Sequence, residues 1–248
     1  MKLKDKSTII SNIVKYSERS ILITFDANHQ LFSLDWLLQK RSWLLDNISD
    51  KLLQVNSTYN SLLVTYNFTI NDFYGEKVAL RQLLLNANEP YNLGFRSVII
   101  PTCYDDEFSI DAKEFEHKKE LSKQDLIRLH SGQSYRVHFI GFLPGFPYLS
   151  QVKKDLYLPR KSQPRPKISA GSVGIAGRQT GIYPVNSPGG WQIIGQTPLC
   201  LFDAKELKTF LKAGDTIRFK PINRNEYDEI KAEIQLDINF QNRFVDES

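Results

Sequence analysis

The chain has 248 residues, of which 41% are hydrophobic and 24% are charged, and its formal net charge is +4 at pH 7. This composition is typical of a folded globular protein, and so small a net charge gives no support to nucleic-acid binding. No apolar run approaches the roughly 20 residues of a membrane-spanning helix, and the polar residues 1–6 are not followed by the apolar segment of a signal peptide. These features predict a cytoplasmic protein.

The first 90 residues predict a small α+β domain. Strand-like runs occupy residues 8–14 and 20–25, and the spacing of leucines predicts a helix over 28–46, with Ser33 or Asn28 as its cap. A strand pair at 52–55 and 62–66 follows, and then a second helix at 72–88. This order of elements suggests an α/β sandwich over residues 1–92. It carries no catalytic pattern, so we expect it to serve as a scaffold or to dock a partner.

The next segment leads into the most informative part of the chain. Residues 96–101 read as a strand that is followed by Cys103, and the acidic run at 105–119 reads as a solvated loop or helix. Ser122 with Asp125 forms a capping pattern for a helix over 123–131, and 135–140 alternates as a strand. Cys103 and Cys200 predict neither a disulfide in a reducing compartment nor a structural zinc site, and no metal is expected.

Residues 138–202 hold most of the prolines and glycines of the chain, interleaved with aromatic and aliphatic residues. Proline fixes φ and glycine permits positive φ, so this stretch predicts short strands joined by rigid loops. Its charges are lopsided, because Asp155 is its single acid against seven Lys and Arg. Arg160 and Arg165 each follow a proline, which stiffens the backbone that carries them. We therefore expect a surface that meets a carboxylate, a phosphate or an acidic partner.

The remaining residues complete the second domain. We expect a strand at 198–202, a short helix at 205–212 that Gly214 ends, a strand at 216–219, and helical spacing over 223–240. The many short strands from 97 to 222 predict a closed β-barrel. The fold class is thus α+β, with the sandwich over 1–92 and a β-barrel domain over 93–248.

Four motifs of this second domain carry a resemblance to a known family. They are residues 141–149 (GFLPGFPYL), the pair Pro159-Arg160 with Pro164-Arg165, residues 170–173 (AGSV) and residues 187–191 (SPGGW). Together they resemble the carboxyltransferase subdomain family, long labelled allophanate hydrolase subunit 1. The resemblance implies that the barrel is cyclophilin-like, without implying prolyl isomerase activity.

The family resemblance implies two classes of function. In the first, the chain is one subunit of an ATP-dependent amide-ring hydrolase that opens 5-oxoproline to glutamate with A-type and C-type partner subunits, and it is inactive alone. ATP is then a cofactor of the complex. In the second, the chain is a regulatory protein that binds and inhibits a sensor histidine kinase. A carboxyltransferase role toward urea or allophanate is a third option, which the lack of a biotin-attachment segment in this sequence weakens.

The candidate site residues come from the motifs and their neighbours. His138 is the titratable candidate for proton transfer, or else a strand histidine that is hydrogen-bonded within the barrel. Trp191 is a stacking wall or a core residue. A small cyclic amide or carboxylate would be bound by Arg160, Arg165, Ser172, Gln179, Thr180, Tyr183, Ser187, Gly189, Gly190 and Trp191. The pocket wall is expected from Phe142, Pro144, Gly145 and Tyr148.

Overall fold

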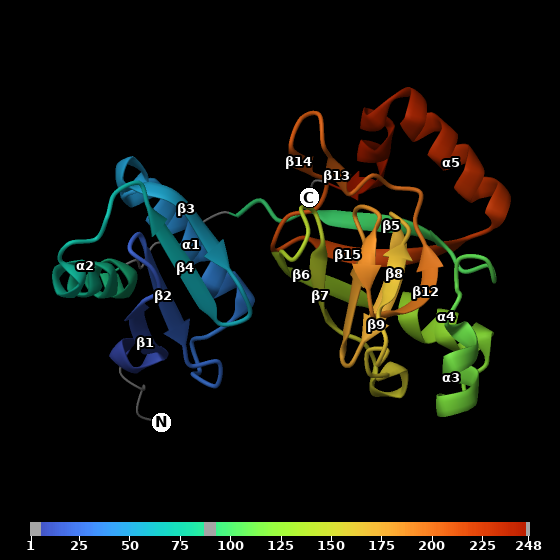
Figure 1. Ribbon diagram of the computed structural model, residues 1–248, viewed down its shortest axis with the longest axis horizontal. Helices are drawn as coiled ribbons and strands as arrows, with labels where there is room; N and C mark the ends of the chain where they lie inside the picture. The colour runs from blue at the N-terminus through green and yellow to red at the C-terminus, as the bar shows by residue number, and fades with distance from the viewer. Residues whose placement is uncertain (1–5, 87–92, 247–248) are drawn as a thin grey trace. The chain divides into compact units, whose positions relative to one another are not determined.

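The computed structural model describes residues 6–86 and 93–246. The chain divides into two compact units, residues 1–94 and 95–248 (Figure 1). The last two residues of the predicted helix at 72–88 lie outside the described residues. The described helices are too short or too polar to span a bilayer.

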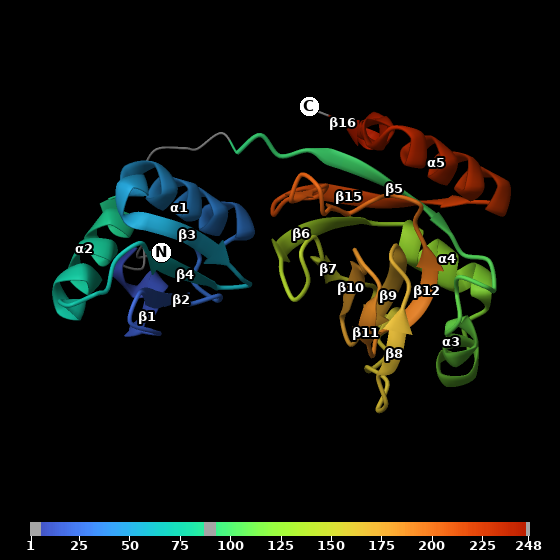
Figure 2. The same cartoon turned by 45° about the horizontal axis from the view of Figure 1, so that its top comes forward.

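The N-terminal unit is a two-layer sandwich, as its pattern of elements predicts. Its sheet has the antiparallel order β1-β2-β4-β3, and helices α1 and α2 lie together on one face of it (Figure 2). The elements are the short helix η1 (Lys6–Ile9), β1 (Ile10–Lys15), β2 (Ser20–Phe25), α1 (Leu34–Asn47), η2 (Ser49–Lys51), β3 (Leu52–Ser57), β4 (Ser61–Tyr66) and α2 (Phe73–Asn86). Helix α1 begins later than position 28 because the Ser33 hydroxyl accepts a hydrogen bond from the Trp36 N–H and so caps the helix there.

The C-terminal unit is built on a closed barrel of seven strands, which confirms the β-barrel prediction. The ring runs β12-β9-β10-β7-β6-β15-β5 and closes because β5 also pairs with β12. The barrel strands are β5 (Ser97–Cys103), β6 (Ser134–Ile140), β7 (Pro147–Gln151), β9 (Ser172–Ala176), β10 (Gln179–Ile182), β12 (Gln192–Gln196) and β15 (Thr216–Ile222). Strands β5 and β15 are parallel, and the other pairs in the ring are antiparallel. The barrel interior is the larger of the hydrophobic cores.

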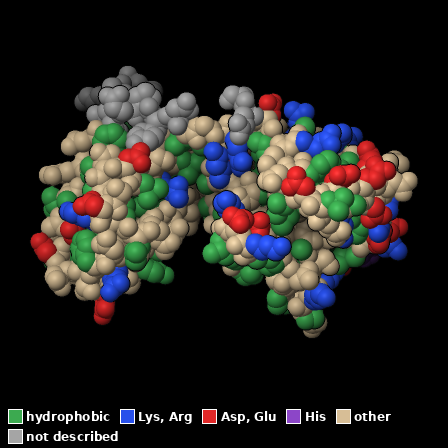
Figure 3. Space-filling model, turned by 90° about the horizontal axis from the view of Figure 1, so that it is seen from above, with side chains coloured by type: hydrophobic (Ala, Val, Ile, Leu, Met, Phe, Trp, Pro, Cys, Tyr) green, Lys and Arg blue, Asp and Glu red, His purple; other side chains and the backbone are tan. Residues whose placement is uncertain are grey.

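The remaining elements surround this barrel. A ribbon of β8 (Arg165–Ile168) with β11 (Ser187–Gly189) extends from it, and β16 (Val245–Asp246) pairs with the first two residues of β5. The helices are α3 (Ala112–Lys119), α4 (Lys123–Ser131), α5 (Arg224–Leu236) and the short η3 (Lys154–Leu156) and η4 (Ile238–Phe244). The face that Figure 3 shows carries both acidic and basic side chains over this unit, as expected for a solvated surface of small net charge.

Three local predictions in the C-terminal unit differ from the structure. Residues 205–212 form no helix, because the Asp203 carboxylate accepts hydrogen bonds from the N–H groups of Lys205 and Glu206 and folds the chain into a turn. This turn joins the short strands β13 (Phe202–Asp203) and β14 (Lys208–Thr209), so the expected strand at 198–202 survives only at its last residue. The helix after residue 223 ends at Leu236, where Asp237 accepts from the N–H of Asn239 and starts the separate helix η4.

A buried histidine, His130, forms hydrogen bonds through both ring nitrogens inside the barrel. The Nδ1 atom of His130 lies 2.9 Å from the Tyr104 hydroxyl and its Nε2 atom lies 3.0 Å from the Thr180 hydroxyl. The Thr180 hydroxyl donates to the Gly174 carbonyl, so it accepts from Nε2–H, and Nδ1 accepts from Tyr104. Full burial lowers the pKa of His130 to about 3. Every polar atom of the imidazole is therefore satisfied in its neutral form.

This histidine is expected to make stability depend on pH. The unfolded chain takes up a proton at His130 below about pH 6.5, whereas the folded chain does not until about pH 3. The contribution of neutral His130 to the free energy of unfolding is therefore fully present above pH 6.5. It decreases as the pH falls below 6.5, by up to about 1.4 kcal/mol per pH unit. Urea unfolding between pH 7 and 5 measures this slope. The slope should be smaller in His130→Asn but unchanged in His117→Asn, a variant of an exposed histidine. Equal slopes in all three proteins would contradict this assignment.

Candidate functional site

The proline- and glycine-rich stretch folds into a cavity whose walls are aromatic rings. The Phe146 ring lies at the centre of this aromatic cluster. It packs edge to face against Tyr183 and Trp191, with ring centroids 5.3 and 5.2 Å away. Phe142 meets the same ring at 5.9 Å and Tyr148 at 5.1 Å. Such tilted contacts are favourable and fix the orientation of each ring. The cluster therefore forms a stiff apolar wall.

The loop between β6 and β7 carries Phe142 and Phe146 of this wall, and two residues with positive φ set its shape. Phe142 has φ 67° and Gly145 has φ 84°. A Cβ atom at position 145 would lie 2.8 Å from the Leu201 carbonyl oxygen, so only glycine fits there. The turn leaves the Phe142 side chain 68% exposed, at the mouth of the cavity. The sequence motif at 141–149 is thus explained by loop geometry.

The cavity has a volume of about 250 Å³. It is lined by Phe142, Phe146, Tyr148, Arg160, Pro164, Tyr183, Pro188, Gly189, Gly190 and Trp191. None of the described residues that line it is a carboxylate. Of the residues that the sequence singles out, the cavity brings together Phe142, Tyr148, Arg160, Tyr183, Gly189, Gly190 and Trp191.

Arg160 supplies the positive charge of the cavity. Its guanidinium carbon lies 5.8 Å from the centre of the Trp191 ring, and the side chain is exposed. No carboxylate of residues 6–86 or 93–246 forms an ion pair with it. A guanidinium that stacks on an indole and lacks an acidic partner is suited to pair with the carboxylate or phosphate of a ligand.

Gly189 lines the cavity at a point where no side chain fits. A Cβ atom at position 189 would lie 2.3 Å from the Tyr183 hydroxyl oxygen. Burial raises the pKa of Tyr183, so its hydroxyl keeps its proton at neutral pH. A ligand in the cavity therefore meets a cation, a neutral hydroxyl and ring faces.

Two other cations of the stretch are held by an acid from outside it. One carboxylate oxygen of Asp111 lies 2.6 Å from Arg165 Nη2 and 2.9 Å from Lys161 Nζ. The other accepts a hydrogen bond from the Ile193 N–H at 2.7 Å. Asp111 is 1% exposed, so the expectation that the acidic run at 105–119 is entirely solvated is wrong at this position. We call Asp111, Lys161 and Arg165 the Asp111 cluster.

The Asp111 cluster fixes the loop that carries Arg160. Lys161 and Arg165 are the two ends of the loop segment that follows Arg160, and both are tied to one buried carboxylate. The Lys161 N–H also donates to the Gly190 carbonyl at 2.7 Å, and the Gln192 side chain donates to the Pro159 carbonyl at 2.9 Å. This loop is therefore attached to the strand end that bears Trp191. The site places Arg160 over Trp191 through these contacts.

The structure places the other predicted site residues outside the cavity lining. Thr180 is buried in the barrel with His130, and Ser172 and Ser187 are buried on β9 and β11. Arg165 belongs to the Asp111 cluster. Gln179 starts β10, and Pro144 and Gly145 belong to the turn between β6 and β7.

His138 lies on β6, next to Phe139, whose ring stacks on Tyr148 at 4.4 Å. It is half-buried and does not line the cavity. Burial, and then the positive charge of Arg136, lowers its pKa, so it is neutral at pH 7. This state suits a proton acceptor, although His138 lies outside the cavity lining.

Sequence reasoning missed Asp111, Phe146, Pro164 and Pro188. The last three lie inside the motifs that carry the family resemblance, and only their side-chain directions were unknown. Asp111 gave no local signal, because the contact spans 54 residues to Arg165 and 82 residues to Ile193. Only the barrel topology brings these segments together.

Comparisons with known proteins agree with this architecture. Residues 11–212 match the family model described as carboxyltransferase domain, subdomain C and D. The B-type subunit of the 5-oxoprolinase of Bacillus subtilis is 45% identical over 162 residues, which are 65% of this chain and 68% of that protein. The corresponding B-type subunit of Escherichia coli O157:H7 is 37% identical over 189 residues, which are 74% of this chain and 85% of that protein.

Solved structures share the fold. All of this chain superposes on 17% of the urea amidolyase of Kluyveromyces lactis with a TM-score of 0.75 and 16% identity. This likeness shows the fold alone. The protein TTHA0988 superposes with a TM-score of 0.70 and 32% identity over 83% of this chain. The chain spans only 40% of the length of TTHA0988.

Proposed function

The chain belongs to the carboxyltransferase domain family, subdomains C and D, and from that premise we propose that it is the B-type subunit of a bacterial 5-oxoprolinase. Relatives that carry this name are 37–45% identical to it over 125–189 aligned residues. The observation that carries the proposal is the cavity in which Arg160 lies over Trp191. The activity belongs to an assembly, and this chain supplies one part of its substrate site.

The cavity has the properties that a small ring with a carboxylate requires. Its volume of about 250 Å³ lies below the roughly 300–1,000 Å³ of pockets that enclose drug-sized ligands. In 5-oxoproline a flat five-membered lactam carries one carboxylate. We place the lactam against the rings of Trp191 and Phe146 and the carboxylate on the Arg160 guanidinium. Tyr183 then offers its hydroxyl as a neutral hydrogen-bond donor.

The reaction also needs groups that this cavity does not hold. When bound to the assembly, ATP would supply a phosphoryl group that activates the lactam carbonyl, but a cavity of about 250 Å³ is too small for a nucleotide. We assign ATP to the assembly with A-type and C-type subunits. His138 remains the candidate proton acceptor, since it is neutral at pH 7. A substrate would have to extend beyond the cavity lining to meet it.

The test is reconstitution. The chain is co-expressed with the A-type and C-type proteins from its own source, and glutamate formation from 5-oxoproline is measured with ATP. Glutamate should form with all three proteins and not when this chain is left out. If the three folded proteins assemble and form no glutamate, the proposal is wrong, and binding to a sensor kinase or action on another cyclic amide takes its place.

A further inference from the structure

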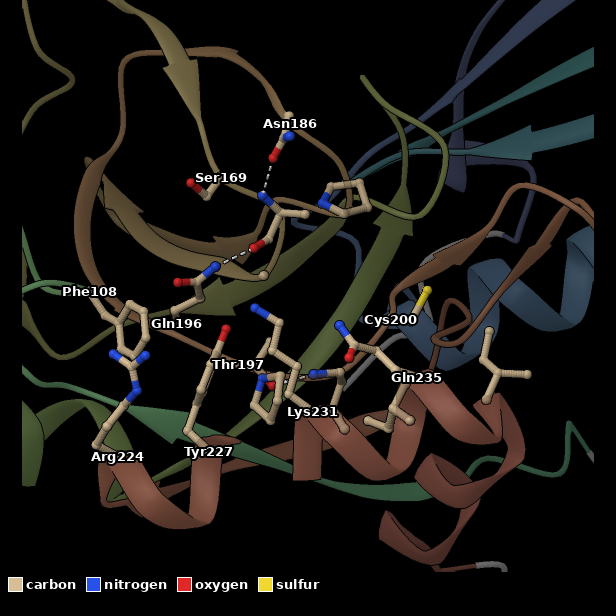
Figure 4. Close-up of a pocket in the computed structure, with 17 residues that line it drawn as sticks. Phe108, Ser169, Asn186, Gln196, Thr197, Cys200, Arg224, Tyr227, Lys231 and Gln235 are labelled. Carbon is tan, nitrogen blue, oxygen red and sulfur yellow. Dashed lines mark hydrogen bonds between the residues drawn. The ribbon is translucent and has the colours of Figure 1, made fainter. Parts of the chain in front are cut away.

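A second cavity lies on the C-terminal unit and shares no residue with the first. Helix α5 forms one side, and the barrel loops at 169–171, 184–186 and 196–200 form the other (Figure 4). Its volume is about 580 Å³, within the range of pockets that enclose small molecules. The proposed function makes no use of it.

The charge of this cavity is positive. Its described lining contains Arg224 and Lys231 and no carboxylate. Arg224 is already paired with Glu107 and Asp228. Lys231 is different, because its Nζ atom lies 5.6 Å from the centre of the Tyr227 ring and none of the described carboxylates pairs with it. An exposed ammonium group at the edge of a cavity is thus available to an anion.

Amide side chains on the opposite side add hydrogen-bonding groups. The Asn186 oxygen accepts from the Ala170 N–H, so its NH₂ group remains for another partner. The Gln196 nitrogen donates to the Ala170 carbonyl, so its oxygen remains as an acceptor. Figure 4 shows these two side chains across the cavity from Tyr227 and Lys231. Both amide side chains thus line the same cavity as Lys231.

The base of the cavity is apolar. Phe108 and Tyr227 pack with their ring centroids 4.6 Å apart, and Leu199 and Ile234 are buried members of the barrel core that reach the lining. Aromatic faces and aliphatic side chains of this kind cover the apolar body of a ligand. One side of the cavity thus suits an apolar group, and its edge suits a charged one.

We propose that this second cavity binds a small amphipathic anion, with a carboxylate or phosphate on Lys231 and an apolar body on Phe108, Tyr227 and Leu199. The site is separate from the cavity around Trp191, so it goes beyond the proposed function and holds or fails without it. Carboxylates and phosphate monoesters share the chemistry that Lys231 recognises. Titration with one carboxylate and one phosphate monoester distinguishes between the two headgroups.

The experiment follows backbone amide NMR shifts of the full chain during titration with phenylacetate, phenyl phosphate and benzylamine. One or both anions should shift the amides of Ala170, Thr197 and Lys231 in a saturable way. Shifts at Gly189 and Gly190 would report binding in the cavity around Trp191 and do not bear on this proposal. Whichever anion binds more tightly identifies the headgroup. Benzylamine has a similar body and the opposite charge, and should not bind.

Two variants complete the test. Lys231→Gln should weaken binding of the anion by about tenfold, as expected when a charged hydrogen bond is lost. Lys220→Gln removes an exposed lysine of β15 that lines neither cavity, and should bind as the parent does. Both are surface changes, and thermal melting checks that they fold. Absence of saturable shifts at Ala170, Thr197 and Lys231, or equal affinities in the two variants, would overturn the proposal.

Discussion

Asp111→Ala is expected to lower the free energy of unfolding by about 3–5 kcal/mol, the effect of removing one partner from a buried ion pair. Asp111 is 1% exposed, and its loss leaves Arg165 and Lys161 without their shared carboxylate and the Ile193 N–H without its acceptor. Urea unfolding at pH 7 measures the change. The loop with Arg160 should also loosen, which limited proteolysis after Arg160 or Lys161 would detect as faster cleavage.

Two further variants separate the effect of the Asp111 charge from that of its hydrogen bond, and a buried carboxylate from an exposed one. Asp111→Asn keeps an oxygen for the Ile193 N–H but loses the charge, so its stability should lie between those of the parent and the alanine variant. Asp106→Ala removes a carboxylate that pairs with Lys123 while its side chain is 91% exposed, and should change stability little. If Asp111→Ala were no less stable than Asp106→Ala, the Asp111 cluster would not hold this loop.

Arg160→Gln is expected to reduce kcat/KM for 5-oxoproline by roughly 10–100-fold in the reconstituted three-protein assembly. The variant keeps a hydrogen-bonding side chain but loses the charge that pairs with the substrate carboxylate. Arg160 is exposed and has no ion pair among the described residues, so folding should be unaffected. Steady-state assays of glutamate formation give the value.

Arg178→Gln is the matched control. Arg178 is also exposed, belongs to the same basic stretch, and lies 5.8 Å from the centre of the Tyr157 ring. It does not line the cavity around Trp191. Its variant should retain the parent's kcat/KM. An equal loss in both variants would mean that general surface charge, rather than contact with the substrate, sets the rate.

The sequence predicts those parts of the fold that depend on local pattern. Apolar periodicity and the capping pattern at Ser122 place helix α4, whose cap is formed by a hydrogen bond from the Asp125 N–H to the Ser122 hydroxyl. The pattern fails where a side chain captures the backbone, as Asp203 does in the turn that replaces the predicted helix at 205–212. Such competition between side chain and backbone does not change the apolar spacing.

The sequence indicates which segments contribute residues to the site, but it does not indicate how their side chains are arranged. The motifs and their neighbours include Arg160, Tyr183 and Trp191, which the structure places around one cavity. They cannot show that Arg165 is paired with Asp111 while Arg160 is not, since that depends on a contact between segments far apart in the chain. Thr180 faces the barrel interior because of its register on β10, which is set by pairing with β9.

The most direct test of the account is the structure of the reconstituted assembly with 5-oxoproline bound and ATP left out. The account predicts the lactam ring against Trp191 and Phe146, with its carboxylate within hydrogen-bonding distance of the Arg160 guanidinium. Substrate density in another subunit, with the cavity around Trp191 holding only solvent, would contradict the central claim that this chain binds the substrate.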